Sequence, residues 1–158
     1  MSNDYDIENF QSIWNRVRSE ESAEEESTDE IGILRKFIDG EAADIAEYGS
    51  LIGKCHGPVS KLLCAILVDE KNHMKKLQTM HFILTGDTYA PEKSQKGYTS
   101  FLEALRGQYN GEVEGSAQYK KAWNSTKNDR LRELYADFST DEFKHSRIIE
   151  EIIAGLMC

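Results

Sequence analysis

Two short motifs occur once in each half of this chain, in the same order and at nearly the same spacing, 29 residues from Glu41 to Glu70 and 30 from Glu112 to Glu142. The first is a Gly-Glu pair, at Gly40-Glu41 and Gly111-Glu112, and the second is Glu-x-x-His, at Glu70 to His73 and Glu142 to His145. The two upstream glutamates lie 71 positions apart, and the two histidines lie 72 positions apart. This register indicates an internal duplication, so each half is expected to form the same structural unit.

Glu and His three positions apart lie on the same side of an α-helix, because three residues turn the chain by about 300°. Both side chains of one motif can then bind one metal ion. Helices over residues 31–54 and 59–85 would form an antiparallel hairpin with its turn at residues 55–58, midway between Glu41 and Glu70. A second hairpin would turn at residues 126–128, midway between Glu112 and Glu142. Both pairs of motifs are therefore predicted to lie level with each other.

Helix start signals support four helices. Ser27 with Glu30, and Ser100 with Glu103, have capping-box spacing, Pro58 suits a first helical turn, and a fourth helix is expected from Asn128. Apolar residues recur at helical spacing in the first, second and fourth of these segments. They are Ile31, Leu34, Phe37, Ile38, Ile45, Leu51 and Ile52; Leu62, Leu63, Ile66, Leu67, Met74, Leu77, Met80 and Leu84; and Leu131, Leu134, Tyr135, Phe138, Ile149, Ile152 and Ile153.

The segment between the two hairpins is long enough to change the topology. Residues 86–99, about 14 residues, can span at most roughly 45 to 50 Å, whereas a 26-residue helix is about 39 Å long. The connection can therefore run back along the bundle and make the second and third helices parallel. We expect an all-α four-helix bundle over residues 29–158, made of two antiparallel hairpins joined by one long crossover.

The net charge of −9 is unevenly distributed. Residues 1–30 contain ten acidic residues and two arginines, and the rest of the chain is close to neutral. We expect residues 1–28 to form an acidic N-terminal arm with a short amphipathic helix carrying Ile7, Phe10, Trp14 and Val17 on one face. Clustered lysine and arginine are missing, which argues against nucleic-acid binding. No apolar run approaches the length of a membrane span.

The cysteines are three in number and form no Cys-x-x-Cys pair. This pattern fits a reducing compartment, so a cytoplasmic location is expected, and it gives no thiolate site for structural zinc. Cys64 lies among leucines and isoleucines and is expected in the core, whereas His56 and His81 fit neither motif and are expected at the surface or in turns.

Buried carboxylates favour a metal centre. Four glutamates inside an apolar bundle would be very costly as bare charges. Two divalent ions would neutralise them, and oxygen ligands with one imidazole per ion suit iron or manganese. The predicted ligands are Glu41, Glu70, His73, Glu112, Glu142 and His145.

Asp44 and two tyrosines lie on the ligand faces of their helices. Asp44, three residues after Glu41, is a possible additional ligand, or alternatively an acid that supports the site or only faces solvent. Tyr48 and Tyr119 lie two turns, roughly 10 Å, beyond the upstream glutamates. They could hydrogen-bond near the metals or simply fill the core.

The motif set resembles the ferritin-like di-iron carboxylate proteins, in which two helices give one Glu each and two give Glu-x-x-His. The repeated Gly-Glu pairs and the motif spacing are most similar to rubrerythrin. The resemblance implies a homodimeric oxidoreductase that reduces hydrogen peroxide or dioxygen with two iron ions per chain (Fe2+/Fe3+), Mn2+ being possible. It also implies that Asp69 and Asp141 accept hydrogen bonds from the histidines of the opposite half.

Two departures from rubrerythrin bear on function. The rubredoxin domain is missing, so electrons would come from an external donor, either rubredoxin or a reductase. Rubrerythrin has a further ligand glutamate where this chain has Gly115. Two alternatives stay open: a ferroxidase or iron-storing protein, and a non-enzymatic, metal-stabilised bundle that recruits a partner through its acidic arm.

Overall fold

The computed structural model describes residues 29–92 and 97–156. The chain divides into two compact units, Met1–Ile33 and Leu34–Cys158. Of the first unit only the helical residues 29–33 are described, so the expected arm with Ile7, Phe10, Trp14 and Val17, and the cap at Ser27, lie outside the described residues. The described residues form a helix over 29–52, α2 (Gly57–Thr85), α3 (Phe101–Ser125) and α4 (Asp129–Leu156), with no strand among them.

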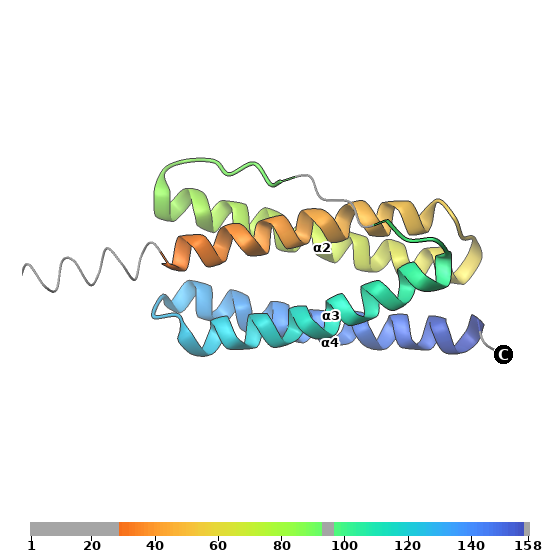
Figure 1. Cartoon of the computed structure of the whole chain (residues 1–158). Coiled ribbons are helices and arrows are strands. Elements are labelled where there is room, and N and C mark those ends of the chain that lie inside the picture. Colours follow the sequence, from red (N-terminus) through yellow and green to blue (C-terminus); the bar gives the residue numbers. More distant parts are fainter. Residues whose placement is uncertain (1–28, 93–96, 157–158) are drawn as a thin grey trace, which may run out of the picture. The chain divides into compact units, whose positions relative to one another are not determined.

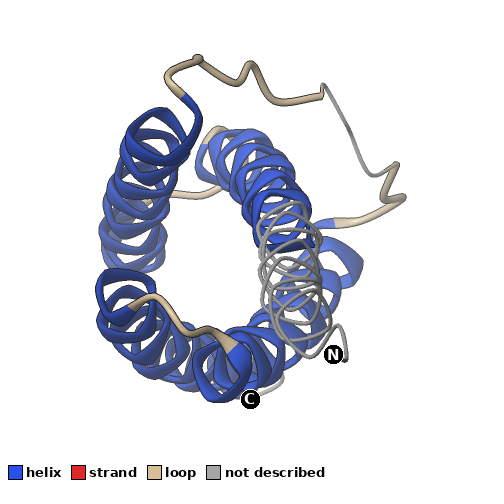
Figure 2. Ribbon diagram, turned by 90° about the vertical axis from the view of Figure 1, so that its left-hand side faces the viewer, coloured by secondary structure: helices blue, strands red, loops and turns tan. Residues whose placement is uncertain are grey.

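The second unit has the predicted topology. Within it, residues 34–52 of the first helix and α2 form one antiparallel hairpin, and α3 and α4 form the other (Figure 1). α2 and α3 are parallel, so the connection between them spans the length of the bundle. Viewed along their axes, the four helices surround a common interior (Figure 2). The prediction of an all-α bundle with one long crossover is therefore confirmed.

The helix ends follow the local sequence. α2 begins two residues before the expected position, with Pro58 in its first turn, and ends at Gly86, whose φ of 77° is in the left-handed region that glycine tolerates. The Ser100 hydroxyl accepts a hydrogen bond from the Glu103 N–H at 3.1 Å and caps α3. The Asn128 side chain accepts bonds from two N–H groups of α4. These capping signals were legible in the sequence because they act within one turn.

The N-terminal part of α2 is apolar on more sides than the interior can cover. Leu63 and Ile66 are fully buried, but Leu62 is 40% exposed and Cys64 is also exposed. The expectation that Leu62 and Cys64 belong to the core is wrong. A helix buries one face, and here Leu63 and Ile66 occupy it, which turns their neighbours outward. Near the other end Leu84, also expected inside, is 39% exposed for the same reason.

His81 lies in the interior, not at the surface as expected, with 1% of its area exposed. Arg35 Nε donates a hydrogen bond to its Nε2 at 3.1 Å, and its Nδ1 lies 3.0 Å from the Asp87 carbonyl oxygen. Both ring nitrogens are thus satisfied, which offsets the cost of burying this polar ring. His56 is exposed in the turn before α2, as expected.

Two apolar regions surround the middle of the bundle. Towards the first hairpin turn, a buried cluster comprises Tyr48, Leu51, Leu63, Ile66, Ala104, Leu105, Ile149 and Ile152. Farther along, aromatic rings pack together, with Phe37 stacked on Tyr119 at 4.1 Å between ring centroids and Phe138 edge-on to Tyr119. The interior between them is therefore bounded by apolar side chains at both ends. No helix in the described part of the chain is both long and apolar enough to cross a membrane.

Candidate metal centre

All six predicted ligands meet in the middle of the bundle. Helix 29–52 supplies one glutamate and α3 another, whereas α2 and α4 each supply a glutamate and a histidine. The residues are Glu41, Glu112, Glu70, His73, Glu142 and His145, and none is more than 4% exposed. The three-residue spacing within α2 and α4 directs Glu and His to the same side, and hairpin pairing brings the upstream glutamates level with them.

The six side chains form two overlapping groups. One consists of Glu41, Glu70, His73 and Glu142, the other of Glu70, Glu112, Glu142 and His145, and within each group one potential ligand atom per residue lies within 4.8 Å of the others. Glu70 and Glu142 belong to both. The glutamates of the two Glu-x-x-His motifs could therefore contribute to both ions of a pair, whereas each remaining Glu and His could contribute to one.

The short distances centre on Glu70. Its Oε1 lies 2.8 Å from His145 Nδ1, and its Oε2 lies 3.4 Å from His73 Nδ1. Glu142 Oε1 is 3.3 Å from His73 Nδ1, and Glu112 Oε2 is 3.4 Å from His145 Nδ1. The two imidazole centroids are 6.0 Å apart. Each histidine thus presents Nδ1 to the carboxylates.

Most of the inward-facing atoms lack a hydrogen-bond partner among the described residues. They are Glu41 Oε2, both oxygens of Glu70, His73 Nδ1, Glu112 Oε2, Glu142 Oε1 and His145 Nδ1. A buried polar atom without a partner typically costs about 1 to 3 kcal/mol. Glu70 Oε1 and His145 Nδ1 are close enough to form an ion pair. The other five atoms point at one another without a hydrogen bond to any described residue, which is a poor arrangement for a protein without metal and fits a pair of cations.

Burial and mutual repulsion disfavour ionisation of two of the glutamates. Burial raises the pKa of Glu41 well above its usual value, and the nearby charge of Glu70 raises it further. The pKa of Glu142 is raised by burial, then by Glu70 and Glu112. Without a cation these carboxyl groups therefore retain protons that an incoming metal ion would have to displace.

Glu70 and His145 are held as an ion pair. Burial alone would raise the pKa of Glu70, but the contacts from His145 and His73 outweigh it and lower the pKa to about 2. Burial opposes charge on His145, but its contacts with Glu112 and Glu70 prevail and raise the pKa to about 10. Protonated His145 therefore takes part of the role that a cation would take.

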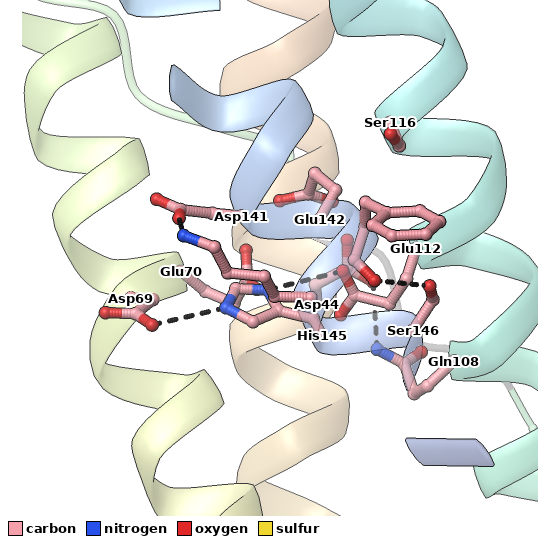
Figure 3. Close-up of polar contacts among 12 residues, drawn as sticks. Asp44, Asp69, Glu70, Gln108, Glu112, Ser116, Asp141, Glu142, His145 and Ser146 are labelled. Atoms are coloured by element: carbon pink, nitrogen blue, oxygen red, sulfur yellow. Dashed lines mark hydrogen bonds and ion pairs between the residues drawn. The ribbon is translucent and has the colours of Figure 1, made fainter. Parts of the chain in front are cut away.

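Each histidine is oriented by an aspartate on the opposite motif helix. Asp69 Oδ2 of α2 lies 3.2 Å from His145 Nε2 of α4 (Figure 3). Asp141 Oδ2 of α4 lies 3.4 Å from His73 Nε2 of α2. A carboxylate at Nε2 fixes the ring and favours the tautomer whose Nδ1 lone pair faces the glutamates. This is the crossed pairing that the resemblance implied.

The two tyrosines are also crossed between the hairpins. The Tyr48 hydroxyl donates to Glu112 Oε1, and the Tyr119 hydroxyl donates to Glu41 Oε1. Burial, followed by the neighbouring carboxylates, raises the pKa of both phenols, so they stay protonated and can donate. Each upstream glutamate consequently has Oε1 anchored by a tyrosine, while its buried Oε2 has no hydrogen-bond partner among the described residues.

Asp44 lies beside the cluster but belongs to neither four-residue group. It accepts a hydrogen bond from Gln108 Nε2 at 3.1 Å (Figure 3). Contact between Asp44 and a metal stays a prediction. Gln108 itself was missed by the sequence analysis, although it lies one helical turn before Glu112 and so shares its face.

Two further residues, Phe138 and Gly115, contact the site in ways that the sequence did not predict. The Phe138 ring packs on His73 with 4.0 Å between ring centroids. Gly115 provides space for Glu142, since a Cβ atom at position 115 would lie 2.7 Å from Glu142 Oε2. The sequence suggested a lost ligand at Gly115, and the structure shows a carboxylate from another helix against it.

The amino-acid sequence is similar to that of a bacterial protein. No protein-family model matches the chain. The uncharacterised protein YhjR of Bacillus subtilis is 26% identical over 114 residues, which cover 72% of this chain and 79% of that protein.

Solved structures are similar at low sequence identity. A hypothetical protein from Pyrococcus furiosus has a TM-score of 0.71 at 15% identity, covering 81% of this chain and 90% of the other. A structure described as ferritin-like, diiron-carboxylate proteins from Bacillus anthracis has a TM-score of 0.70 at 20% identity, covering 81% and 97%. This chain therefore has a ferritin-like four-helix fold, and its interior contains a buried Glu and His cluster that could hold metal.

Proposed function

We propose that this protein is a di-iron oxidoreductase resembling rubrerythrin, which reduces hydrogen peroxide or dioxygen. The observation that carries the proposal is the sharing of Glu70 and Glu142 by two buried ligand groups. One group alone would suit a single ion, whereas two groups with common carboxylates suit a bridged pair. The charges agree, because four carboxylates balance two divalent ions.

The assignment of ligands follows from the contacts. Glu41 and His73 would hold one ion, Glu112 and His145 the other, and Glu70 and Glu142 both. Bound Fe2+ ions would supply one electron each, and peroxide takes up two electrons and two protons to give two water molecules. A bound pair of such ions would also supply Lewis acidity that polarises the oxygen atoms of the substrate.

The surrounding residues would hold this centre in place. Asp69 and Asp141 orient the imidazoles, and Tyr48 and Tyr119 each hold one oxygen of an upstream glutamate. The apolar clusters on both sides lower the local dielectric constant, which strengthens the electrostatic interactions within the site. Ligand side chains held in one orientation would keep the ions in the same positions from one turnover to the next.

Electrons to restore Fe2+ would come from outside the chain. Cys55 and Cys64 are free thiols, and the sequence has no Cys-x-x-Cys pair that could form a rubredoxin-type iron site. We therefore propose rubredoxin or a reductase as donor, and a homodimer as the working form by resemblance.

The first test is metal content, measured by elemental analysis of protein purified without oxygen. We expect two iron or manganese ions per chain, with loss of metal in Glu70→Ala and Glu142→Ala. Glu133→Ala, which removes an exposed glutamate of α4, is the matched control and should retain both ions. A wild-type protein that takes up no metal under these conditions refutes the proposal.

The reaction is tested next on the reduced, iron-loaded protein. Anaerobic addition of hydrogen peroxide should consume one peroxide for every two Fe2+ ions oxidised. Iron retention far above two ions per chain, in a particle much larger than a dimer, would instead identify an iron-storing protein. Full metal binding without either reaction would identify a metal-stabilised bundle.

A further inference from the structure

A pocket connects the cluster with the surface between helix 29–52 and α3. Its volume is about 200 Å³. The inner wall contains Glu41, Tyr119 and Glu142, which are buried, and the outer wall contains the exposed residues Lys36 and Glu114. We call it the Gly40 pocket, after a residue of its wall. It joins solvent to two of the candidate ligands directly.

Three glycines keep the Gly40 pocket open. Gly40 directly precedes Glu41, Gly111 directly precedes Glu112, and Gly115 lies about one helical turn after Glu112. All three glycines line the pocket. A Cβ atom at Gly40 would meet no atom within 4 Å, so the space beside it is empty of protein. Glycine within a helix costs roughly 0.5 to 1 kcal/mol relative to alanine, so helix stability alone would not favour these residues here.

Buried carboxylates face the same space. Glu41 is 4% exposed, lines the pocket, and has an Oε2 atom without a hydrogen-bond partner among the described residues. Glu142 extends from the pocket into the cluster: its Oε2 lies against Gly115, while its Oε1 is 3.3 Å from His73 Nδ1. An ion in the pocket would therefore meet a carboxylate that already reaches the site.

The charge of the pocket favours cations. Its wall contains two carboxylates nearer the surface, from Asp44 and Glu114, against the single ammonium group of Lys36, and two buried acidic side chains, Glu41 and Glu142, at its inner end. Gln108 donates to Asp44 and Gln118 donates to Glu114 at 2.8 Å, which orients the two outer carboxylates. An acidic passage with low-dielectric walls concentrates cations and speeds their association.

We propose that the Gly40 pocket is the entry port for divalent metal ions, with Glu114 and Asp44 attracting the ion and Glu142 passing it inward. This inference rests on the proposed metal centre. The inference concerns the route by which an ion reaches the centre and not the residues that bind it, so an experiment can refute the route without refuting the centre.

The test measures the rate of Co2+ uptake by the full-length, metal-free protein, followed by the visible absorption of bound Co2+. Gly40→Leu should slow uptake severalfold and leave the final number of bound ions unchanged, because the new side chain enters the pocket without replacing a ligand. Gly49→Leu is the matched control. Gly49 lies on the same helix and is exposed, a Cβ atom there would meet no atom within 4 Å, and the residue does not line the pocket.

A second variant tests the charge. Glu114→Gln should slow uptake at low salt, and added salt should slow the wild-type protein more than this variant, because salt screens exposed charges. The proposal that ions enter through the Gly40 pocket would be refuted by two results together. These are uptake by Gly40→Leu as fast as by the wild type, and a salt dependence in Glu114→Gln equal to that of the wild type. Absence of Co2+ binding in the wild type would refute the metal centre instead.

Discussion

The tyrosine hydroxyls define how much freedom the upstream glutamates have. Tyr119 anchors Oε1 of Glu41, and Tyr48 anchors Oε1 of Glu112, so in both cases the other oxygen is the one without a hydrogen bond among the described residues. A carboxylate that would otherwise rotate is thereby restricted to one arrangement. Hydrogen bonds of this kind around metal ligands commonly contribute 10- to 100-fold to metal affinity.

Tyr119→Phe removes one such anchor and keeps the ring packing on Phe37. We expect metal affinity to fall about tenfold, because Glu41 loses its partner and becomes less well oriented. Competition with a chelator measures this change. Tyr109→Phe, at a partly buried tyrosine of the same helix that packs on the apolar cluster, should leave affinity unchanged. Equal affinity in the two variants would contradict the anchoring role.

Gly115→Ala should stabilise the metal-free protein slightly but weaken metal binding. Alanine favours the helix by up to about 1 kcal/mol, so the metal-free protein should be at least as stable. The new methyl group lies where it would displace Glu142 Oε2, so metal affinity should fall about tenfold. Thermal unfolding with and without metal separates the two effects. Gly49→Ala, where no atom is close, should raise stability without weakening metal binding.

At the level of helices, α2 and α4 are tied to each other through the site. Each supplies a histidine and the aspartate that orients the histidine of the other. A single Asp-Glu-x-x-His motif therefore cannot orient its own histidine, and two copies must face each other. The internal duplication supplies this second copy on the same chain.

Asp69→Ala should weaken metal binding about 10- to 100-fold, since His145 would no longer be held with Nδ1 inward. Asp141→Ala should act in the same way through His73. Metal competition assays on both variants check this. Asp137→Ala, at an exposed aspartate of α4, is the control. Unchanged affinity in Asp69→Ala and Asp141→Ala would show that the two contacts do not position the histidines.

The start of α3 depends on one capping residue. Ser100→Ala should lower the free energy of unfolding by about 1 kcal/mol, because the Glu103 N–H loses its acceptor. Denaturant unfolding measures the loss. Ser100→Asp should restore most of it, since aspartate also caps helices. A loss that Asp does not restore would point to another role for Ser100.

For the molecule as a whole, protons and metal ions compete for the same interior. Without metal, His145 has a pKa raised to about 10. A group whose pKa is raised by folding stabilises the folded state fully below its unfolded pKa, about 6.5, and loses that contribution as pH rises to 10. The metal-free protein should therefore become less stable across this range.

Bound metal replaces these protons, so the difference in melting temperature between loaded and metal-free protein should grow from pH 6.5 towards pH 9. Metal binding should also release protons, because Glu41 and Glu142 have raised pKa values and His145 is protonated. Calorimetry in buffers of different ionisation enthalpy measures the number released. A melting difference that shrinks with pH would contradict this picture.

Local patterns in the sequence determined the helices, the two hairpins and the identity of the six clustered side chains. Periodicity, caps such as Ser100 and Asn128, and the equal spacing of the two halves act over one turn or along one hairpin, so they can be read without a structure. The long crossover also followed from its length.

Only the tertiary structure shows which side of each helix packs into the interior of the bundle. It turned Cys64 and Leu62 outward and His81 inward, made Glu70 and Glu142 common to both ligand groups, and placed Glu142 against Gly115. These outcomes depend on the rotation of each helix about its axis and on which side chains fill the space between four helices. No single segment carries that information, because packing is settled jointly by all of them.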